Sequence, residues 1–311
     1  MDQNPGIDVR QAKVMVQSIV NHHFEERPRR IIHHPSGLTN FVFLVILKKG
    51  EFFVRLNPDP AKLSVYIKEQ WAISKATELG IPTLEILEVG NQVVSVPYMI
   101  SRRVKGVQAT DHPDKNKIIY EMGRYTSLIN SIPTNDYGRT FNWSNNQLSR
   151  NSTWRDFLKS ELNLEENLII LRKYHIFKDD ILKKIQWTLL KADKLIKQPS
   201  LNHGDIRMKN IIVDRSGKII AIIDWEDCLS TLAPAWDLSL ALHDLSVDEK
   251  HIFIEGYGIS PLQLSKISPV IKAINIINYA PEIDRLGRNK EKARLELYRA
   301  RLRGSFDLYS I

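Results

Sequence analysis

The sequence contains a single cysteine, Cys228, among its 311 residues. One cysteine excludes an internal disulfide and every zinc site built from several cysteines. The glycosylation sequons at Asn142 and Asn151 are interpreted as chance matches, because glycosylation needs the secretory route. The chain is therefore expected to fold around its own hydrophobic core.

Long apolar segments are also lacking. The longest uninterrupted apolar run, Phe41 to Leu47, is far shorter than the roughly 20 residues that a helix needs to cross a bilayer. The segment from Met1 to Lys13 is polar and does not have the basic-then-apolar order of a secretory signal. We therefore expect a cytoplasmic protein without a membrane partner.

Acidic residues are in the minority, with 36 Asp and Glu against 44 Lys and Arg, a net charge of +8. This balance suits an anionic partner such as nucleotide phosphate, nucleic acid or acidic lipid. The basic residues are spread along the chain, and no zinc spacing, RNP-like string or recognition-helix signature is found. A basic nucleic-acid-binding domain is therefore a minor alternative, and no nucleic-acid partner is expected.

The first hundred residues predict a small, mostly antiparallel sheet with helices. A glycine and a proline, Gly80 and Pro82, end the longer of these helices. The run Phe41 to Leu47 and its successor EFFVRL predict a β-hairpin across a Lys-Lys-Gly turn. The expected helices are 9–24 and 61–79, and the expected strands are 41–47, 51–56, 84–89 and 93–100.

From Lys117 onward the apolar period becomes helical, which predicts a helix-rich second part. Thr153 and Asp156 have the spacing of a capping box at the start of one helix, and 181–196 predicts another. A short hairpin, 211–213 with 219–223, interrupts the helices. The boundary between the two parts is expected near residues 100–106, and the fold class is α+β.

The segment LNHGDIRMKNIIVDRSGKIIAIIDWED carries the most chemical information. Asp205 is followed five positions later by Asn210, and Asp224 ends the second strand of the hairpin. Phosphoryl transfer needs an acceptor hydroxyl held in line and phosphate charge neutralised by magnesium. Asp205 can orient or accept the hydroxyl proton, while Asn210 and Asp224 offer hard oxygen ligands. Singly each residue is better explained as a turn, cap or strand-entry residue; the ordered set favours a site.

The chain resembles the aminoglycoside phosphotransferase and choline kinase family, relatives of the protein kinases. The resemblance rests on HGDIRMKN, on IIDWED and on APAWDLSLAL. It implies a two-lobed protein-kinase-like fold: a nucleotide-binding lobe over 1–100, a hinge over 101–106 and a helical lobe over 107–311. It also implies that Asp205 is the catalytic aspartate, that Asn210 and Asp224 are metal ligands, and that Asp237 braces the catalytic loop.

The same resemblance implies ATP, with GTP not excluded, and Mg²⁺ as cofactors. The expected reaction moves the γ-phosphoryl group to a hydroxyl of an aminoglycoside, an amino alcohol or a sugar. An antibiotic-modifying role and a metabolic role both remain open, as does the oligomeric state. The competing interpretation is a pseudokinase that binds nucleotide without turnover.

Two residues of the first part are candidates for positioning the phosphates. Arg55 occupies a strand position where this family carries a basic residue, and its guanidinium can contact phosphate. Glu69 lies on an otherwise largely apolar helix face, so its carboxylate needs a partner. Arg55 and Glu69 are therefore predicted to pair, the alternative being an ordinary surface ion pair.

The remaining nucleotide candidates are in loops. HHPSGLTN has the place of a phosphate-covering loop, with Ser36 and Thr39 as ligands, although its single glycine also fits a plain turn. The segment Ser101 to Arg103 matches the hinge whose backbone would bind adenine.

The sequence leaves open the role of four charged residues near Asp205 and Asp224. Arg207 and Lys209 replace small or proline residues of the family, and either can stabilise transferring phosphate or face solvent. The solvated interpretation is slightly favoured for Arg207. Glu226 and Asp227 would attract an amine-bearing acceptor or be solvated.

Overall fold

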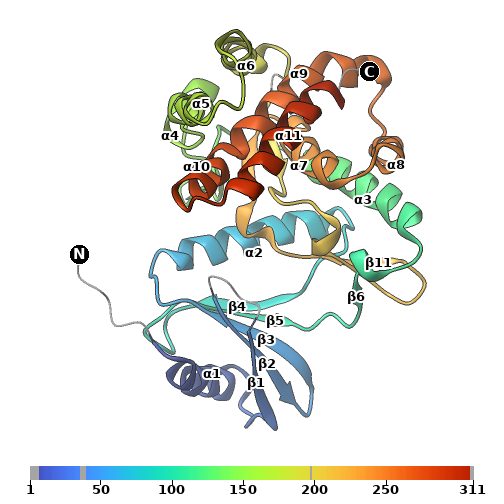
Figure 1. Ribbon diagram of the computed structural model, residues 1–311. Helices are drawn as coiled ribbons and strands as arrows, with labels where there is room; N and C mark the ends of the chain where they lie inside the picture. Colours follow the sequence, from blue (N-terminus) through green and yellow to red (C-terminus); the bar gives the residue numbers. More distant parts are fainter. Residues whose placement is uncertain (1–6, 36–39, 197, 309–311) are drawn as a thin grey trace. The chain divides into compact units, whose positions relative to one another are not determined.

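The computed structural model describes residues 7–35, 40–196 and 198–308, the last four of these by backbone alone. Contacts within the chain divide it into two compact units, and each is described separately below (Figure 1). The hairpin that carries Asp224 groups with the first unit, although it is far along the sequence. The first unit contains Met1–Val107 and Ile212–Glu226, and the second contains Gln108–Ile211 and Asp227–Ile311. The hinge expected over 101–106 stays a prediction.

A five-stranded antiparallel sheet forms the first unit, in the order β1-β2-β3-β5-β4. The predicted hairpin is confirmed, with β2 (Phe41–Leu47) paired to β3 (Gly50–Leu56). Strand β1 (Arg30–His34) was not predicted, because it is a short, half-exposed edge strand whose residues do not form a clear apolar run. Strands β4 (Ile86–Gly90) and β5 (Tyr98–Arg102) follow, and β5 begins later than expected because the preceding residues form bends.

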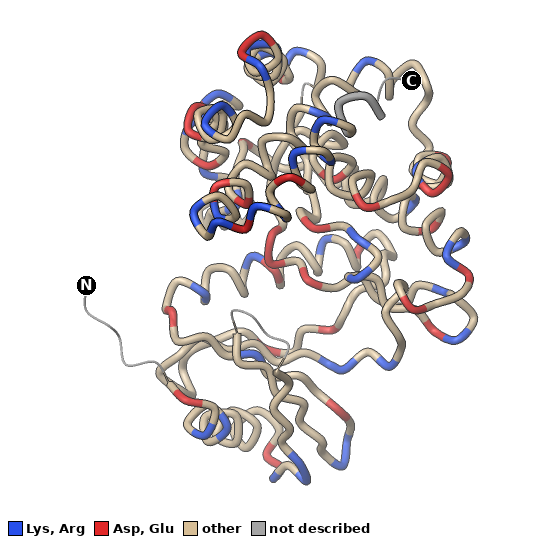
Figure 2. Tube along the Cα trace, viewed as in Figure 1, with Lys and Arg blue, Asp and Glu red and all other residues tan. Residues whose placement is uncertain are grey.

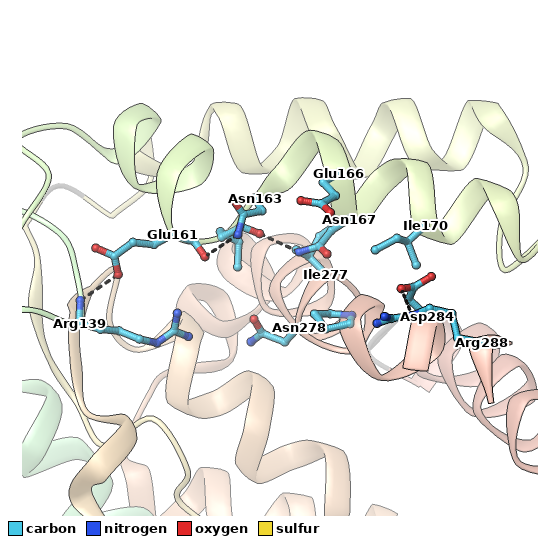
Figure 3. A pocket seen from close by; sticks show the side chains of 12 residues that line it. Arg139, Glu161, Asn163, Glu166, Asn167, Ile170, Ile277, Asn278, Asp284 and Arg288 are labelled. Atoms are coloured by element: carbon cyan, nitrogen blue, oxygen red, sulfur yellow. Dashed lines mark hydrogen bonds and ion pairs between the residues drawn. The ribbon is translucent and has the colours of Figure 1, made fainter. Parts of the chain in front are cut away.

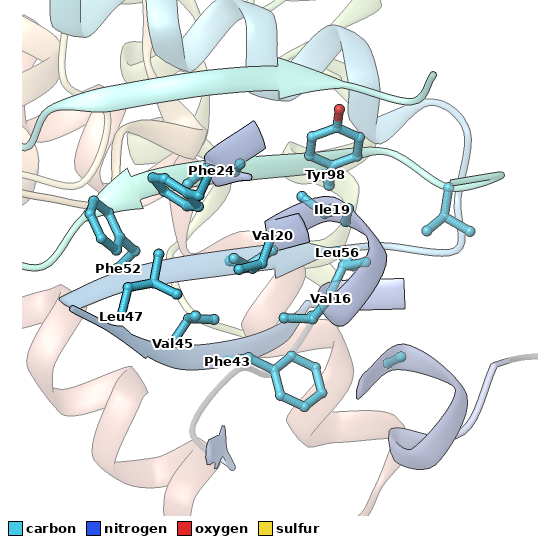
Figure 4. Close-up of a cluster of buried hydrophobic side chains, with 14 residues drawn as sticks. Val16, Ile19, Val20, Phe24, Phe43, Val45, Leu47, Phe52, Leu56 and Tyr98 are labelled. Carbon is cyan, nitrogen blue, oxygen red and sulfur yellow. The ribbon is translucent and has the colours of Figure 1, made fainter. Parts of the chain in front are cut away.

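Helix α1 (Val9–Phe24) has the predicted bounds and begins with a capping box, in which the Asp8 side chain accepts from the N–H of Gln11. Its apolar residues recur at helical spacing, so they form one buried face. This face joins side chains of the sheet in a hydrophobic cluster, as Figure 4 shows for Val16, Ile19 and Phe24. Burial of each large apolar side chain stabilises the fold by about 1.5–3 kcal/mol, which anchors the sheet.

Two further elements complete the first unit. Helix α2 (Lys62–Glu78) packs on β4 and β5, and its bounds agree with the prediction to within one residue at each end. The hairpin of β10 (Ile211–Val213) and β11 (Ile219–Ile222) forms a small sheet with β6 (Val107–Gln108). The N–H of Ile222 also donates to the carbonyl of Pro82, so the end of β11 is fixed just before Asp224.

The second unit is helix-rich, as predicted. Thr153 caps α4 through the N–H of Asp156, and the helix predicted over 181–196 ends at Leu190. Short strand pairs connect the helices: β7 (Phe141–Asn142) with β8 (Gln147–Leu148), and β9 (Ser200–Asn202) with β12 (Leu229–Thr231). The helices are α3 (Lys115–Asn130), α4 (Trp154–Ser160), α5 (Leu164–Lys173), α6 (Asp179–Leu190), α7 (Ala235–Asp244), α8 (Val247–Tyr257), α9 (Pro261–Asn278), α10 (Ala280–Arg288) and α11 (Lys292–Leu308).

Charged side chains are interspersed in both units. Figure 2 shows Lys and Arg (blue) and Asp and Glu (red) distributed over the elements of both units. Within the described residues, no helix has both the length and the apolar content that crossing a membrane requires.

Candidate active site

The loop between β9 and β10 brings Asp205 and Asn210 together. The Asn210 amide nitrogen donates to the backbone carbonyl of Asp205 at 2.8 Å and to its Oδ2 at 3.0 Å. Asn210 is buried, so its amide is held in one orientation. Both nitrogen contacts are made to Asp205, so the amide oxygen is the atom that this side chain offers to a cation.

The backbone of the loop depends on a glycine. Gly204 has φ +84°, and a Cβ added there would lie 2.0 Å from the carbonyl oxygen of Asp227. Any other residue would meet this backbone atom in addition to the strain of the left-handed conformation. His203 is fully buried and its Nδ1 lies 3.2 Å from the N–H of Asp205. The HGD segment therefore folds as one rigid turn that presents Asp205.

A buried carboxylate on α7 holds this turn. Asp237 Oδ2 accepts from the N–H of His203 and from the Asn130 amide, both at 2.9 Å, and Oδ1 accepts from the N–H of Gly204 at 3.0 Å. Burial raises the pKa of Asp237 to about 6, although the three hydrogen bonds oppose that rise. These contacts match the bracing role that the family resemblance implies.

The raised pKa of Asp237 predicts a specific pH dependence of stability. A carboxyl whose folded pKa exceeds its unfolded value contributes stability that is complete below about pH 4 and is lost as pH rises through about pH 6. The expected loss is about 3 kcal/mol for a shift of roughly two pKa units. Urea unfolding at several pH values, compared between the wild type and Asp237→Asn, measures this contribution. Parallel pH curves for the two proteins would contradict it.

Two cations flank Asp205. Arg207 Nε lies 2.9 Å from Asp205 Oδ1, and Lys209 Nζ lies 2.8 Å from Oδ2. The slight preference for a solvent-facing Arg207 is therefore wrong: its side chain is 27% exposed and is drawn inward by Asp205 and by Asp244 at 3.4 Å. Lys209 is more open, with 51% of its side chain exposed.

Asp224 follows β11 in the first unit and has φ 68°. A left-handed backbone at a residue other than glycine costs about 1–2 kcal/mol, and such strain clusters at functional sites. Asp205 and Asn210 belong to the second unit by contact. The assignment of Asp224 as a metal ligand stays a prediction.

Arg55 and Glu69 form an ion pair within the first unit. Glu69 is 1% exposed, so the pair is buried and the alternative of an ordinary surface ion pair does not apply. The Arg55 guanidinium also lies 5.2 Å from the centre of the Tyr66 ring. Burial alone would lower the pKa of Arg55, but the Glu69 charge raises it above the ordinary value, so the guanidinium stays charged.

The pair is testable through Glu69→Gln, which keeps the shape and a hydrogen bond but removes the charge. We expect kcat/KM for ATP to fall about tenfold, equivalent to roughly 1.4 kcal/mol, because Arg55 loses its positioning partner. The melting temperature should fall by only a few degrees. Glu78→Gln is the matched control, since Glu78 pairs with Lys75 on the exposed side of the same helix. Unchanged ATP kinetics in Glu69→Gln would reject the role.

A polar cluster next to Arg55 was missed at the sequence level. Asn40 Oδ1 accepts from the Tyr66 hydroxyl and from the Asn57 amide, both at 2.9 Å. Glu226 pairs with Lys62 and accepts from the Asn40 amide. Asn40 ends the HHPSGLTN segment and Glu226 belongs to IIDWED, but neither segment predicts their contact, which long-range packing creates.

Glu226 is thus not a solvated acid. Its burial would raise the pKa of the carboxyl, but Lys62 and then Arg55 lower it below the ordinary value. Ser36 and Thr39, the candidates in the predicted phosphate-covering loop, lie outside the described residues.

The predicted adenine segment lies at the end of β5. Ser101 is buried and pairs in register with Phe53 of β3. The N–H of Arg103 donates to the carbonyl of Glu51, and its guanidinium pairs with the Glu51 carboxylate at 3.1 Å. An adenine bound here would therefore use backbone groups other than the N–H of Arg103.

A polar pocket of about 370 Å³ lies in the second unit between α5 and α10. Figure 3 shows Arg139 and Glu161 at one end and Asp284 and Arg288 at the other. The Arg139 guanidinium lies 5.2 Å from the ring of Trp236, the residue before the anchoring Asp237. Arg139, which lines the pocket, therefore contacts α7 next to the residue that braces the Asp205 turn. Its polar lining includes Arg139, Glu161, Glu166, Asn278, Asp284 and Arg288.

The sheet unit, the helical unit and the braced Asp–Asn loop define a kinase-like phosphotransferase. The family model described as "Phosphotransferase enzyme family" matches residues 30–266, and the chain belongs to this family. The predicted family, the kinase-like α+β fold and the enzyme class are thereby confirmed.

Individual relatives are distant. Hygromycin-B 4-O-kinase of Escherichia coli is 22% identical over 172 residues, which cover 53% of this chain and 48% of that protein. The match therefore spans about half the length of this curated relative. The crystal structure of aminoglycoside phosphotransferase APH(4)-Ia has a TM-score of 0.68 at 16% identity, covering 95% of this chain and 99% of that chain.

A second solved structure is a nucleotide complex. The GDP complex of an aminoglycoside 2'-phosphotransferase-IIIa mutant has a TM-score of 0.64 at 15% identity, covering 96% of this chain and all of that one. At these identities the likeness establishes the fold.

Proposed function

We propose that this protein transfers the γ-phosphoryl group of ATP to a hydroxyl of a small molecule. The observation that carries the proposal is the Asp205 carboxylate, hydrogen-bonded to Asn210 on a turn that the buried Asp237 braces. A fixed carboxylate can orient an acceptor hydroxyl and receive its proton. Since Asp205, Asn210 and Asp224 are all present, no observation favours the pseudokinase alternative.

Magnesium, when bound, would neutralise phosphate charge. Asn210 and Asp224 are the proposed ligands, and they fit, since both offer the hard oxygen atoms that Mg²⁺ prefers. Among the described side chains, no group of three or more Asp, Glu, His or Cys residues is arranged so that it could hold a metal ion. Mg²⁺ does not need one, because water and substrate phosphates complete its coordination.

Nucleotide phosphates are assigned to Arg55, positioned by Glu69, and adenine to the backbone of Ser101 to Arg103. A relative of this fold has been crystallised with AMP-PNP and hygromycin B, with a TM-score of 0.65 and 17% identity. That complex supports ATP as donor, whereas the GDP complex of another relative keeps GTP open.

The acceptor is assigned to the polar pocket between α5 and α10. Its three acidic side chains, Glu161, Glu166 and Asp284, outnumber its two arginines. This lining suits an amine-bearing, hydroxyl-rich molecule such as an aminoglycoside, and amino alcohols or sugars are the other candidates. The related E. coli enzyme is a hygromycin-B kinase, which makes hygromycin B the first acceptor to test.

Glu166 provides the test of the pocket. It lies at the exposed rim of the pocket on α5. Glu166→Gln should raise KM for a cationic acceptor about fivefold, or roughly 1 kcal/mol, with kcat nearly unchanged. The reason is that the lost attraction stabilises the bound acceptor equally in the ground state and in the transition state. Glu165→Gln is the matched control: Glu165 is the neighbouring residue, bonds to Gln186 and does not line the pocket. Equal acceptor KM values in the two variants would show that the acceptor binds outside this pocket.

Substrate-dependent ADP release from MgATP tests the function as a whole. Hygromycin B, other aminoglycosides, amino alcohols and sugars would be screened at equal concentration, with GTP as a second donor. At least one acceptor should increase ADP release and yield a phosphorylated product by mass spectrometry. Absence of nucleotide binding, with salt-sensitive binding to generic DNA, would replace the proposal by the nucleic-acid alternative.

A further inference from the structure

Helix α7 contacts the catalytic loop at both of its ends. Asp237, in its first turn, accepts from the N–H groups that precede Asp205. Asp244, its last residue, lies 3.4 Å from Arg207, which follows Asp205. Residues seven apart are two helical turns apart on one face, roughly 10 Å along the axis. One helix therefore holds the loop on both sides of the catalytic carboxylate.

Arg207 lies between two carboxylates. Its Nε is 2.9 Å from Asp205 Oδ1 and 3.4 Å from Asp244 Oδ2, while its N–H is aligned with neither oxygen, so both contacts are ion pairs rather than directed hydrogen bonds. Burial alone would lower the pKa of Arg207, but the two carboxylates raise it, and a hydrogen bond with Tyr279 adds to this effect. The guanidinium therefore stays charged and is shared between α7 and the loop.

The C-terminal helix continues this line of alternating charges. Asp244 Oδ1 accepts from Arg301 Nη2 of α11 at 2.8 Å, and the same nitrogen donates to the carbonyl of His243 at 3.1 Å. Arg301 thus determines which way the Asp244 carboxylate is turned. The series Arg301, Asp244, Arg207, Asp205 connects α11 to the catalytic carboxylate.

Helix α11 is itself firmly attached where this series begins. Arg299 donates to the carbonyl of Tyr174 at 2.7 Å, and Arg303 donates to the carbonyls of His175 and Ile176 at 2.9 and 3.0 Å. Leu302 between them is fully buried. The Arg301 side chain, 42% exposed, is therefore presented from a helix that is anchored on both sides of it.

We propose that Arg207 is a positioning residue that orients the Asp205 carboxylate, and that Asp244 and Arg301 hold Arg207 in place. The inference rests on the proposed catalytic role of Asp205. Arg207 suits this task better than Lys209, because its planar guanidinium is half-buried and held from two sides, whereas Lys209 is half-exposed and makes one flexible (i, i+4) pair. The C-terminal helix is then part of the apparatus that sets the geometry of transfer.

The test measures ADP release from MgATP with hygromycin B as the acceptor probe. If hygromycin B is not phosphorylated, ADP release is measured without an acceptor. Arg207→Met should lower kcat by about ten- to a hundredfold, the scale of a misplaced reacting group, with KM for ATP within about threefold. Arg207→Lys should restore part of kcat. Asp244→Asn and Arg301→Met should each lower kcat about threefold to tenfold. The double variant Arg207→Met with Asp244→Asn should match Arg207→Met alone, because Asp244 acts through Arg207.

Arg124→Met is the matched control, since Arg124 pairs with Glu121 on the surface of α3. Its kcat should equal that of the wild type, and urea unfolding should show all single variants folded. Wild-type kcat in Arg207→Met, or full additivity of the double variant, would overturn the inference. If the wild type shows no acceptor-dependent ADP release, the proposed function itself fails. If Asp205→Asn releases ADP as fast as the wild type, the catalytic role of Asp205 and this inference fail together; if only Arg207→Met does so, the positioning role alone fails.

Discussion

Asp205→Asn should lower phosphoryl transfer by roughly 10²- to 10⁴-fold, the range that a positioned general base contributes. The substitution keeps the size of the side chain and removes the negative charge that orients the acceptor hydroxyl. ATP affinity should change only a few fold, because the nucleotide is assigned to residues of the first unit. Steady-state ADP release and calorimetric binding of AMP-PNP measure the two quantities separately.

A lower rate of transfer in Asp205→Asn could come from the missing carboxylate or from a less stable protein, and the unfolding free energy of the variant distinguishes the two. Asp205 is also paired with Arg207 and Lys209, so its replacement leaves two cations close together. That change should appear as a shift in unfolding free energy of about 1 kcal/mol or less, because both pairs are partly solvated. Turnover equal to that of the wild type would rule out the catalytic role, whatever the stability of the variant.

Asp237→Ala should cause the largest loss of stability. It removes the acceptor of three hydrogen bonds inside the protein and leaves the N–H groups of His203 and Gly204 and the Asn130 amide unpaired. Each unpaired buried donor costs about 1–3 kcal/mol, and a domain has only about 5–15 kcal/mol in total. We expect little folded protein at 37 °C and no measurable transfer.

Asp237→Asn separates geometry from charge at this position. The amide has one accepting oxygen instead of two, so it can keep only part of the three hydrogen bonds that Asp237 accepts. The variant should therefore fold with reduced stability and have a lower kcat. Urea unfolding and ADP release of the same preparation measure both effects. A stable, fully active Asp237→Ala protein would show that the α7 carboxylate does not brace the catalytic turn.

Local regularities predicted much of the fold correctly. The apolar period of α1, the alternation of β2 and β3, and the glycine and proline that end α2 are short-range signals, and each led to nearly correct bounds. Strand β1 was missed because an edge strand buries little surface and needs no strong pattern. In the C-terminal region, α10 and α11 are separated where Lys290 adopts φ 57°.

The candidate site was predictable where spacing along the chain is enough. Asp205 and Asn210 are five residues apart, so one turn brings them into contact, and the spacing predicts this. The environment of Arg207 was not predictable, because Asp244 and Tyr279 come from distant helices and turn its side chain inward. The same holds for Asn40 and Glu226, which meet only through long-range packing.

The sequence alone determined the class of fold and the identity of the proposed catalytic and metal-binding residues, because both follow from short motifs, their order along the chain and the family that they resemble. Tertiary structure decided which groups the Asp237 carboxylate accepts from, which cations contact Asp205, and how deeply Arg55 and Glu69 are buried. The physical reason is that burial and charge pairing depend on side chains contributed by remote segments, and no local pattern encodes those contacts.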